Sequence, residues 1–221
     1  MSPEAHLPAP PKPPRIPARL EPCNCTTEGE SSVELIAFDA GDELAGIERR
    51  DITCDRCSFA QASLAGASVE GATVTDVDCF GSDVSNLRAR GGSFERVLMR
   101  DTRAVGISLL EARLRDVEFV ESNLDLARCR FAQLERVAFR GCRLRDADFS
   151  NAKLASVTFE GCDLTKVDFT KAVFARCEIR SCVIEGVRGL VNLEGIAMPF
   201  PDLIELAPSL ARALGLHVLD S

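Results

Sequence analysis

The sequence predicts an all-β solenoid, a coil of about seven turns that is closed at its C-terminal end by a helix. An apolar residue stands at every fifth position from Cys54 to Ile184, and the phase never slips over these twenty-seven positions. Two residues before each of them lies a second uncharged position, as at Val117 and Ala127. Every twentieth residue repeats in kind, which predicts four five-residue units per turn. One such column holds Phe119, Phe139, Phe159 and Ile179.

A step of five excludes the ordinary secondary structures. An α-helix needs apolar recurrence near ~3.6 residues and a flat strand needs alternation by ~2 residues. Alternation does hold inside each unit, so two inward residues flank one outward residue and the next two residues must turn the chain. Glycine recurs at the second turn position, as at Gly81 and Gly141, where positive φ is useful. At ~4.8 Å per turn, the coil should be ~32 Å long.

The remaining segments flank this coil. Eight prolines fall within residues 1–22, which predicts an extended, disordered arm; a ligand for an aromatic-lined groove is the alternative. Residues 23–51 are expected to cap the open end, with a strand over 32–38 and an irregular first turn near Ile47. The repeat occupies 52–188. In the C-terminal cap, 189–221, helical spacing interrupted by Pro208 predicts one kinked helix or two short ones, followed by a short strand over 216–219.

Several units carry a recognisable signature. The segments Ala147-Asp148-Phe149, Cys162-Asp163-Leu164 and Ser122-Asn123-Leu124 resemble the A(D/N)(L/F)xx motif of pentapeptide-repeat proteins. The resemblance covers about 137 of the 221 residues, from 52 to 188. It implies a right-handed quadrilateral β-helix. Many positions before the central residue hold Arg, Glu, Ser or Lys in place of Asp or Asn, a departure that affects the surface and leaves the coil intact.

The chain has ten cysteines, and eight of them fall on inward positions of the repeat. We therefore expect reduced thiols in the core, as is usual in a reducing compartment. One column would stack three thiols, although stacked side chains rarely reach disulfide geometry: Cys142, Cys162 and Cys182. A CxC and a CxxC pair about thirty residues apart could supply a tetrahedral zinc site, although two of the four are already inward: Cys23, Cys25, Cys54 and Cys57. No metal or cofactor is expected.

The sequence offers little for catalysis. The two histidines, His6 and His217, lie outside the repeat, so no Ser/His/Asp or Cys/His set can form on the coil. Recurring carboxylates such as Asp148 and Asp163 are read as solvated or turn-bonding side chains. We expect a protein that is not an enzyme. It has neither the apolar region of a signal peptide nor an apolar run near ~18 residues, so a cytoplasmic location without a membrane is expected.

The pentapeptide-repeat resemblance implies a protein partner. Several such proteins bind DNA gyrase or topoisomerase IV as imitators of duplex DNA and protect the enzyme from its poisons. Residues 52–188 contain twenty acidic and twenty basic side chains, so charge supports mimicry only locally. Acids prevail between Cys54 and Ser85, where the candidate contacts are Asp76, Asp78 and Asp83. Direct nucleic-acid binding is disfavoured, because acids interleave with the bases of the middle coil.

Two further surfaces are predicted to make contacts. Four outward apolar residues interrupt the polar surface within about one turn of the coil, either as a contact site for a partner or as a surface across which the N-terminal segment or arm folds back: Leu110, Val120, Leu126 and Phe131. The tail resembles the C-terminal end through which some gyrase-interacting relatives pair, which implies a possible homodimer through Leu203, Leu206, Leu210, Leu214 and Val218. The alternative function is a structural or scaffolding protein with an unrelated partner.

Overall fold

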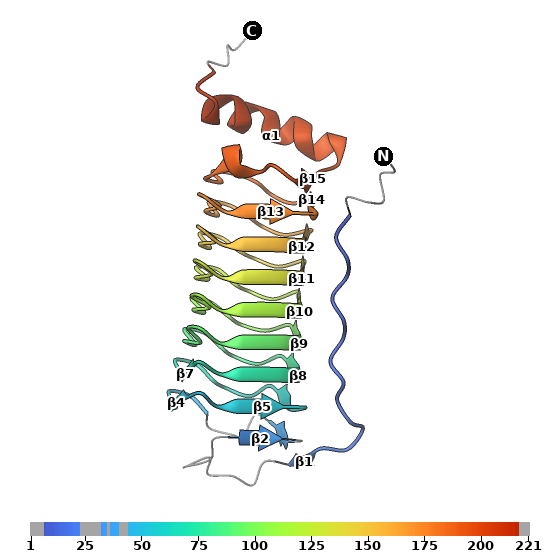
Figure 1. Cartoon of the computed structure of the whole chain (residues 1–221), viewed down its shortest axis with the longest axis vertical. Helices are drawn as coiled ribbons and strands as arrows, with labels where there is room; N and C mark the ends of the chain where they lie inside the picture. The colour runs from blue at the N-terminus through green and yellow to red at the C-terminus, as the bar shows by residue number, and fades with distance from the viewer. Residues whose placement is uncertain (1–6, 23–31, 35, 40–43, 217–221) are drawn as a thin grey trace.

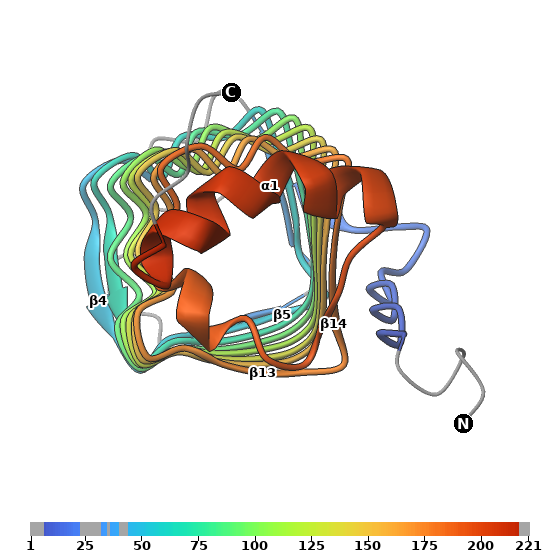
Figure 2. The ribbon, with the colours of Figure 1, turned by 90° about the horizontal axis from the view of Figure 1, so that it is seen from above.

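The chain folds as a four-sided coil with an arm along one side and a helix over its C-terminal end. A computed structural model describes residues 7–22, 32–34, 36–39 and 44–216. Figure 1 shows the coil from the side and Figure 2 shows its square section from the end. Its elements are β1 Glu21–Pro22, β2 Ser32–Glu34, β3 Ile36–Phe38, β4 Glu48–Arg50, β5 Thr53–Asp55, β6 Ser58–Ala60, β7 Ser68–Glu70, β8 Thr73–Phe80, β9 Ser93–Arg100, β10 Arg113–Val120, β11 Gln133–Arg140, β12 Lys153–Glu160, β13 Val173–Ala175, β14 Cys177–Arg180, η2 Leu190–Asn192, β15 Ile196–Ala197 and α1 Phe200–Ala213.

The strand register confirms four units per turn. Strands β8 to β12 pair in parallel in chain order, and each residue lies beside the residue twenty positions later, as Arg113 lies beside Gln133. The two ends depart from this step. At the N-terminal end Ser32 pairs with Thr53, twenty-one positions away, and at the other end Cys177 pairs with Ile196, nineteen away. The coil makes about eight turns, one more than the repeat predicts, because residues before Ile52 add a turn.

The inward positions form one continuous apolar core. Phe139, Phe159 and Leu144 are at most 2% exposed, as the five-residue period predicts. The Phe column stacks face to face, with ring centroids of Phe119 and Phe139 5.0 Å apart and those of Phe139 and Phe159 4.9 Å apart. These distances equal about one strand spacing, so like residues stack because the coil repeats.

Each corner of the square turns on a residue with positive φ. These residues stand two positions after the central apolar residue, and twenty described residues other than glycine adopt this left-handed conformation. Gly81 and Gly141, at φ 61°, adopt it without a Cβ penalty, which confirms the predicted use of glycine there. The other corners hold ordinary L-residues at a cost on the order of 1 kcal/mol each. Their side chains therefore stand in columns along the edges of the rod.

The two ends of the coil are built differently. The predicted strand over 32–38 is present as β2 and β3, and β4 begins next to Ile47. At the C-terminal end α1 is one helix that contains Pro208, and its Leu206 is only 3% exposed. Asp202 at the helix start accepts a hydrogen bond from the Ser181 N–H at 2.6 Å, which ties the helix to the last coil. The strand predicted over 216–219 lies almost wholly outside the described residues.

Candidate binding surfaces

One corner of the coil carries a column of alternating charge. Seven residues with positive φ follow one another along this corner at twenty-residue steps, and we call this set the corner ladder: Arg56, Asp76, Arg96, Asp116, Arg136, Ser156 and Arg176. The strands β8 to β12 bend through this corner, so the register of the sheet fixes the spacing of the column. Each aspartate therefore has an arginine one coil above it, and adjacent coils lie ~4.8 Å apart.

The two aspartates of the ladder are held by paired hydrogen bonds. Arg96 donates from Nε and Nη2 to the two oxygens of Asp76 at 2.7 and 2.9 Å, and Arg136 binds Asp116 in the same way at 2.7 and 2.8 Å. Asp76 is 6% exposed and Asp116 is 2% exposed. Such bidentate ion pairs fix the relative positions of the two side chains more strongly than a single hydrogen bond does. The ladder is therefore a rigid, largely buried ionic column.

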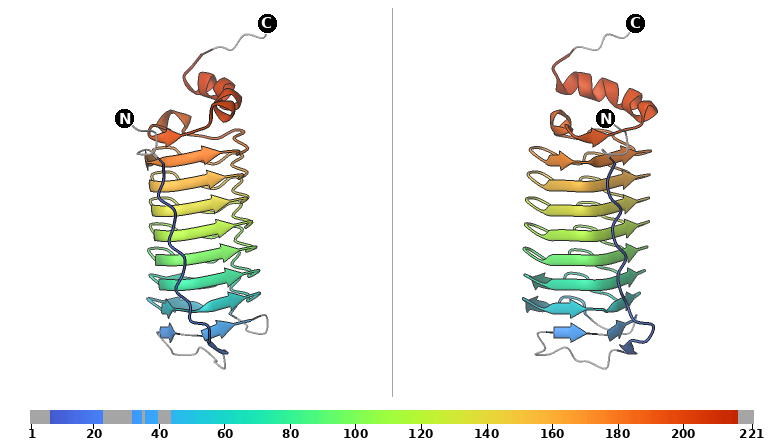
Figure 3. Two further views of the ribbon diagram at one scale, coloured as in Figure 1. Left: turned by 90° about the vertical axis from the view of Figure 1, so that its right-hand side faces the viewer. Right: turned by 45° about the vertical axis from the view of Figure 1, so that its right-hand side comes forward.

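The N-terminal arm, residues 7–22, lies along this corner (Figure 3). The Arg15 backbone N–H donates to Asp76 Oδ1 at 2.8 Å, and the Lys12 N–H donates to Asp116 Oδ1 at 3.1 Å. Strand β1 at the end of the arm then pairs with β3. The sequence predicts an extended, disordered arm; the structure has it extended and places it against the coil.

The arm and the arginines set the ionisation of the two aspartates. Hydrogen bonds from Arg96 are the main influence that lowers the pKa of Asp76, and the Arg15 N–H lowers it further against burial. At Asp116 burial is the largest influence and raises the pKa, but Arg136 and the Lys12 N–H together outweigh it, so that this pKa is also lowered. Both carboxyl groups are thus charged acceptors at neutral pH.

The structure separates the three aspartates predicted as partner contacts. Asp76 belongs to the corner ladder, whereas Asp78 pairs with Arg100 at 2.7 Å. Asp83 accepts the Ser85 N–H at 2.9 Å within its own turn. The same two-residue turn bond recurs at four other positions of the repeat: Asn123, Asp148, Asp163 and Asp168. This confirms the turn-bonding role expected for the recurring carboxylates.

The four outward apolar residues do not form one patch. One turn takes twenty residues, so Leu110 and Phe131, twenty-one residues apart, lie at the same corner on neighbouring coils, whereas the other two residues lie elsewhere on the circumference. Leu126 and Phe131, at positive φ, occupy two different corners and are 53% and 51% exposed, whereas Val120 ends strand β10 at a third corner. The Arg130 guanidinium lies 5.6 Å from the centre of the Phe131 ring. Contact through these residues remains a proposal for separate sites.

The inward cysteines are buried free thiols, and several have a structural role that the repeat does not reveal. Cys142 donates from Sγ to the Phe119 carbonyl at 3.4 Å, and Cys162 donates to that of Phe139 at 3.3 Å. Ser82 holds the same column position and donates to the Phe59 carbonyl at 3.1 Å. These side chains link successive coils. A column of small donors at twenty-residue spacing is the sequence signal for this role.

The proposed zinc ligands are only partly described. Cys23 and Cys25 lie outside the described residues. Cys54 and Cys57 are buried in the core, and their mutual hydrogen bond lowers the pKa of Cys57 to about 7 and raises that of Cys54. Within the described part of the chain, no group of three or more His, Cys, Asp or Glu side chains is placed to hold a metal ion.

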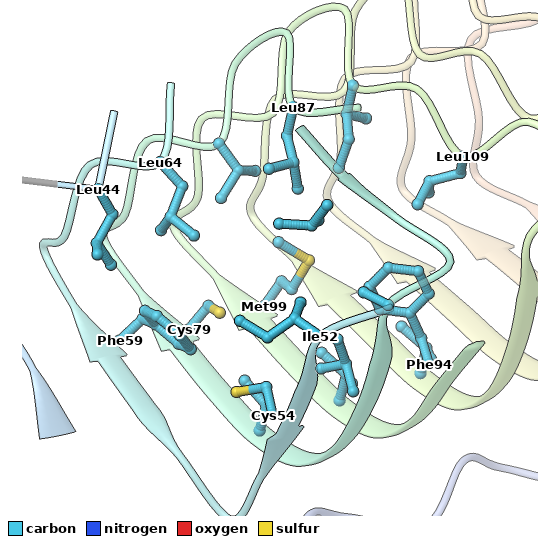
Figure 4. A pocket seen from close by; sticks show the side chains of 18 of the residues that line it. Leu44, Ile52, Cys54, Phe59, Leu64, Cys79, Leu87, Phe94, Met99 and Leu109 are labelled. Atoms are coloured by element: carbon cyan, nitrogen blue, oxygen red, sulfur yellow. The ribbon is translucent and has the colours of Figure 1, made fainter. Parts of the chain in front are cut away.

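The N-terminal half of the core contains a cavity of about 130 Å³ (Figure 4). Its lining is almost wholly apolar and includes Phe59, Cys79 and Met99, which belong to the column that continues as Phe119 and Phe139. The smaller side chain at Cys79 interrupts the ring stack of this column. The cavity therefore results from the size of the side chains in these coils and not from a change in the backbone.

The cap helix exposes part of its apolar surface. Leu206 packs inward and Leu210 is half-buried, whereas Leu203 and Leu214 are 44% and 63% exposed. Two residues outside the predicted set are also exposed, Phe200 at 73% and Ile204 at 58%, and Val218 lies outside the described residues. No described helix has the length and apolarity needed to cross a membrane.

Sequence reasoning missed the corner ladder, although a signal for it exists. Reading every twentieth residue reveals the inward columns, and the same step applied to the turn positions gives Arg, Asp, Arg, Asp, Arg from residue 56 to residue 136. The aspartates at 76 and 116 would then stand two coils apart, before any contact is known.

Comparisons with known proteins agree with this architecture. Residues 123–188 match the family model described as pentapeptide repeat region. A comparison with curated protein sequences gives no match. Similar solved structures include full-length QnrB1, a plasmid-mediated fluoroquinolone resistance protein, at 17% identity over 81% of this chain and 99% of that chain, with a TM-score of 0.35.

Other similar structures have different biological settings. HetL, a pentapeptide repeat protein involved in heterocyst differentiation regulation in the cyanobacterium Nostoc sp. strain PCC 7120, is 14% identical over 76% of this chain and 90% of that chain, with a TM-score of 0.30. A pentapeptide repeat protein from the Arabidopsis thaliana thylakoid lumen is 24% identical over 42% of this chain and 64% of that chain, with a TM-score of 0.29. At these TM-scores the likeness carries no argument about function.

Proposed function

We propose that this chain, which is a pentapeptide-repeat protein, is a non-enzymatic module that binds a partner protein through the outside of its coil. The placement of its reactive side chains supports this most directly. The eight described cysteines are buried, and aspartates that recur in the repeat bond to their own turns. What the rod offers to other molecules is therefore its outer surface and its two ends.

DNA gyrase or topoisomerase IV is the partner that the pentapeptide-repeat resemblance implies, through imitation of duplex DNA. A mimic needs unpaired acidic side chains along the rod, since B-DNA carries one negative charge per ~1.7 Å. Many coil acids are instead in ion pairs, such as Asp78 with Arg100 and Glu118 with Arg140. Asp101 and Glu121 are exposed, lie one coil apart at the same corner and have no ion pair among the described residues. We place the proposed acidic contact at this pair.

A supercoiling assay with purified gyrase, with and without a poison, tests this partner. We expect the protein to inhibit supercoiling or protect the enzyme at micromolar concentration, and the variant Asp101→Lys/Glu121→Lys to lose the effect. Asp146→Lys is the matched control, because Asp146 is also exposed but lies at another corner. Absence of both inhibition and protection by the unchanged protein removes gyrase as the partner. Equal loss in the control would show that overall charge matters and not this corner.

A scaffolding role is the second candidate, and the exposed apolar face of α1 favours it. Phe200, Leu203 and Ile204 are all more than 40% exposed on a helix that already buries Leu206 against the coil. An apolar surface of this kind suits pairing with a second copy, end to end, which would give a longer rod. Small-angle scattering separates the two states, since a dimer of this kind has nearly twice the length of one coil. A rod of one coil length at all concentrations would exclude pairing.

A further inference from the structure

We propose that the corner ladder is a binding site for proline-rich segments in the polyproline II conformation, and that the N-terminal arm is its intramolecular ligand. The inference deepens the proposed binding-module function and depends on it. The ligand class is an extended segment that has prolines at most positions and a free backbone N–H at every third residue. While the arm is bound, it competes with any such segment of another protein.

The periods of the arm and the coil agree. Polyproline II has three residues per turn and rises ~3.1 Å per residue, so three residues advance ~9.3 Å. Two coils advance ~9.6 Å at the ordinary strand spacing. Asp76 and Asp116 are two coils apart, and the donors Arg15 and Lys12 are three residues apart. The arm therefore presents one backbone N–H to each carboxylate of the ladder.

The burial of the arm has the same period. Pro8, Pro11 and Pro14 are half-buried, whereas the residues between them are exposed. A segment with three residues per turn presents every third side chain to one side, so this pattern means that one face of the arm packs on the coil. Proline supplies that face at low conformational cost, because its φ is fixed before binding.

The composition of the corner also sets it apart. Glycine relieves the left-handed turn at eight corner positions of the repeat, and all eight lie at the other three corners: Gly66, Gly71, Gly81, Gly91, Gly106, Gly141, Gly161 and Gly186. From Arg56 to Arg176 the ladder has no glycine and accepts the backbone strain at each turn. In place of glycines, this corner therefore carries a column of side chains, and two of them, Asp76 and Asp116, bind the arm.

The arm lies over a carboxylate and supplies it with a hydrogen-bond donor. Asp116 is 2% exposed with the arm in place, and its Oδ1 accepts both from Arg136 and from the Lys12 N–H. A carboxylate at low exposure needs its oxygens satisfied, so the site favours a donor at this position. A backbone N–H at every third residue supplies it, and the side chains of Lys12 and Arg15 remain exposed.

Hydrogen exchange in the full-length chain tests the docked arm. We expect the amides of Lys12 and Arg15 to exchange at least ~10-fold more slowly than their intrinsic rates, and the amides of Ala9 and Ala18 to exchange faster than these two. Exchange of Lys12 and Arg15 at intrinsic rates would overturn the proposal.

Binding of a synthetic peptide of residues 7–20 tests the site. The full-length variant Lys12→Pro/Arg15→Pro removes both donors while it keeps the polyproline conformation, so its arm should leave the ladder. We expect this variant to bind the peptide at least ~10-fold more tightly than the unchanged chain, in which the tethered arm competes at an effective concentration near ~1 mM. Lys12→Ala/Arg15→Ala is the control; it keeps both N–H groups and should exclude the peptide as the unchanged chain does.

The peptide itself provides the complementary comparison, which needs no change to the coil. A peptide with proline at positions 12 and 15 should not bind the released variant, whereas a peptide with alanine there should bind. Equal binding of the two peptides, or no difference between the released variant and the unchanged chain, would refute the site. Gyrase protection or pairing that persists in that case would leave the broader binding function standing.

Discussion

The cavity in the N-terminal half of the core predicts a stabilising substitution, Cys79→Phe. Cys79 stands in the column between Phe59 and Met99 and lines the cavity. Phe59 already stacks on Phe38 from the other side, with ring centroids 4.5 Å apart. A ring at position 79 would extend this stack by one coil, as rings do at Phe119 and beyond.

The cavity volume sets the size of the effect. At ~24 cal/mol per Å³, filling all of the 130 Å³ would raise the free energy of unfolding by about 3 kcal/mol. One phenyl ring fills part of this space, and misfit in a packed core costs on the order of 1 kcal/mol or more. We therefore expect a net gain of about 1–2 kcal/mol, or ~2–8 °C in melting temperature for a chain of this size.

Urea denaturation followed by circular dichroism measures the gain. Cys129→Phe is the matched control, because Cys129 is equally inward and 3% exposed but does not line the cavity. Overpacking there should lower the free energy of unfolding by ~1–3 kcal/mol. If Cys79→Phe is as destabilising as Cys129→Phe, the space at position 79 cannot accept a ring, and the reasoning from column and cavity is wrong.

Three further predictions concern the core, the ladder and the cap. Phe139→Ala should lower the free energy of unfolding by about 3–5 kcal/mol in the same urea assay, since it opens a void inside the ring stack. The lowered pKa values of Asp76 and Asp116 mean that their stabilisation is present above the unfolded value of ~3.9 and is lost as the pH falls through the folded values. Protection of the arm amides, relative to intrinsic rates, should thus persist from pH 8 to 4 and be lost only as the pH falls below the ordinary carboxyl value of ~3.9 toward the lowered folded values. If α1 pairs two copies, Leu203→Glu/Ile204→Glu should give a monomer by light scattering, and an unchanged mass would exclude this face.

The fold was predictable because a strict period leaves few structures open. Two inward residues in every five, aligned at twenty-residue steps, determine the section of the coil, the strand positions and the identity of core residues such as Phe139 and Leu144. The ends were less predictable. Their strands pair at offsets of twenty-one and nineteen residues, so the repeat phase does not extend to β2 or β15.

The candidate sites were harder to predict, because residues that are close in sequence can lie on different sides of the coil. Leu126 and Phe131 are five residues apart but occupy different corners, because each five-residue unit turns the chain onto the next side. Asp76 and Asp78 are even closer in sequence, yet the first lies under the arm and the second pairs with Arg100. Two residues of a solenoid are therefore expected to be close in space only when their separation in sequence is near a multiple of one turn.

The length of the arm site follows from the ladder and not from the arm. The polyproline and coil periods differ by only ~0.3 Å per pair of coils, so a proline-rich segment could stay in register over several such steps. The acceptors do not continue that far: two coils beyond Asp116 the ladder holds Ser156, and in the other direction the ladder begins at Arg56, only one coil before Asp76, so it has no member two coils before Asp76. A neutral hydroxyl accepts more weakly than a carboxylate, and a guanidinium cannot accept at all. The site is thus specific for a segment with two backbone N–H donors three residues apart. A third carboxylate, as in Ser156→Asp, should extend the site by two coils and bind the N–H of Ala9.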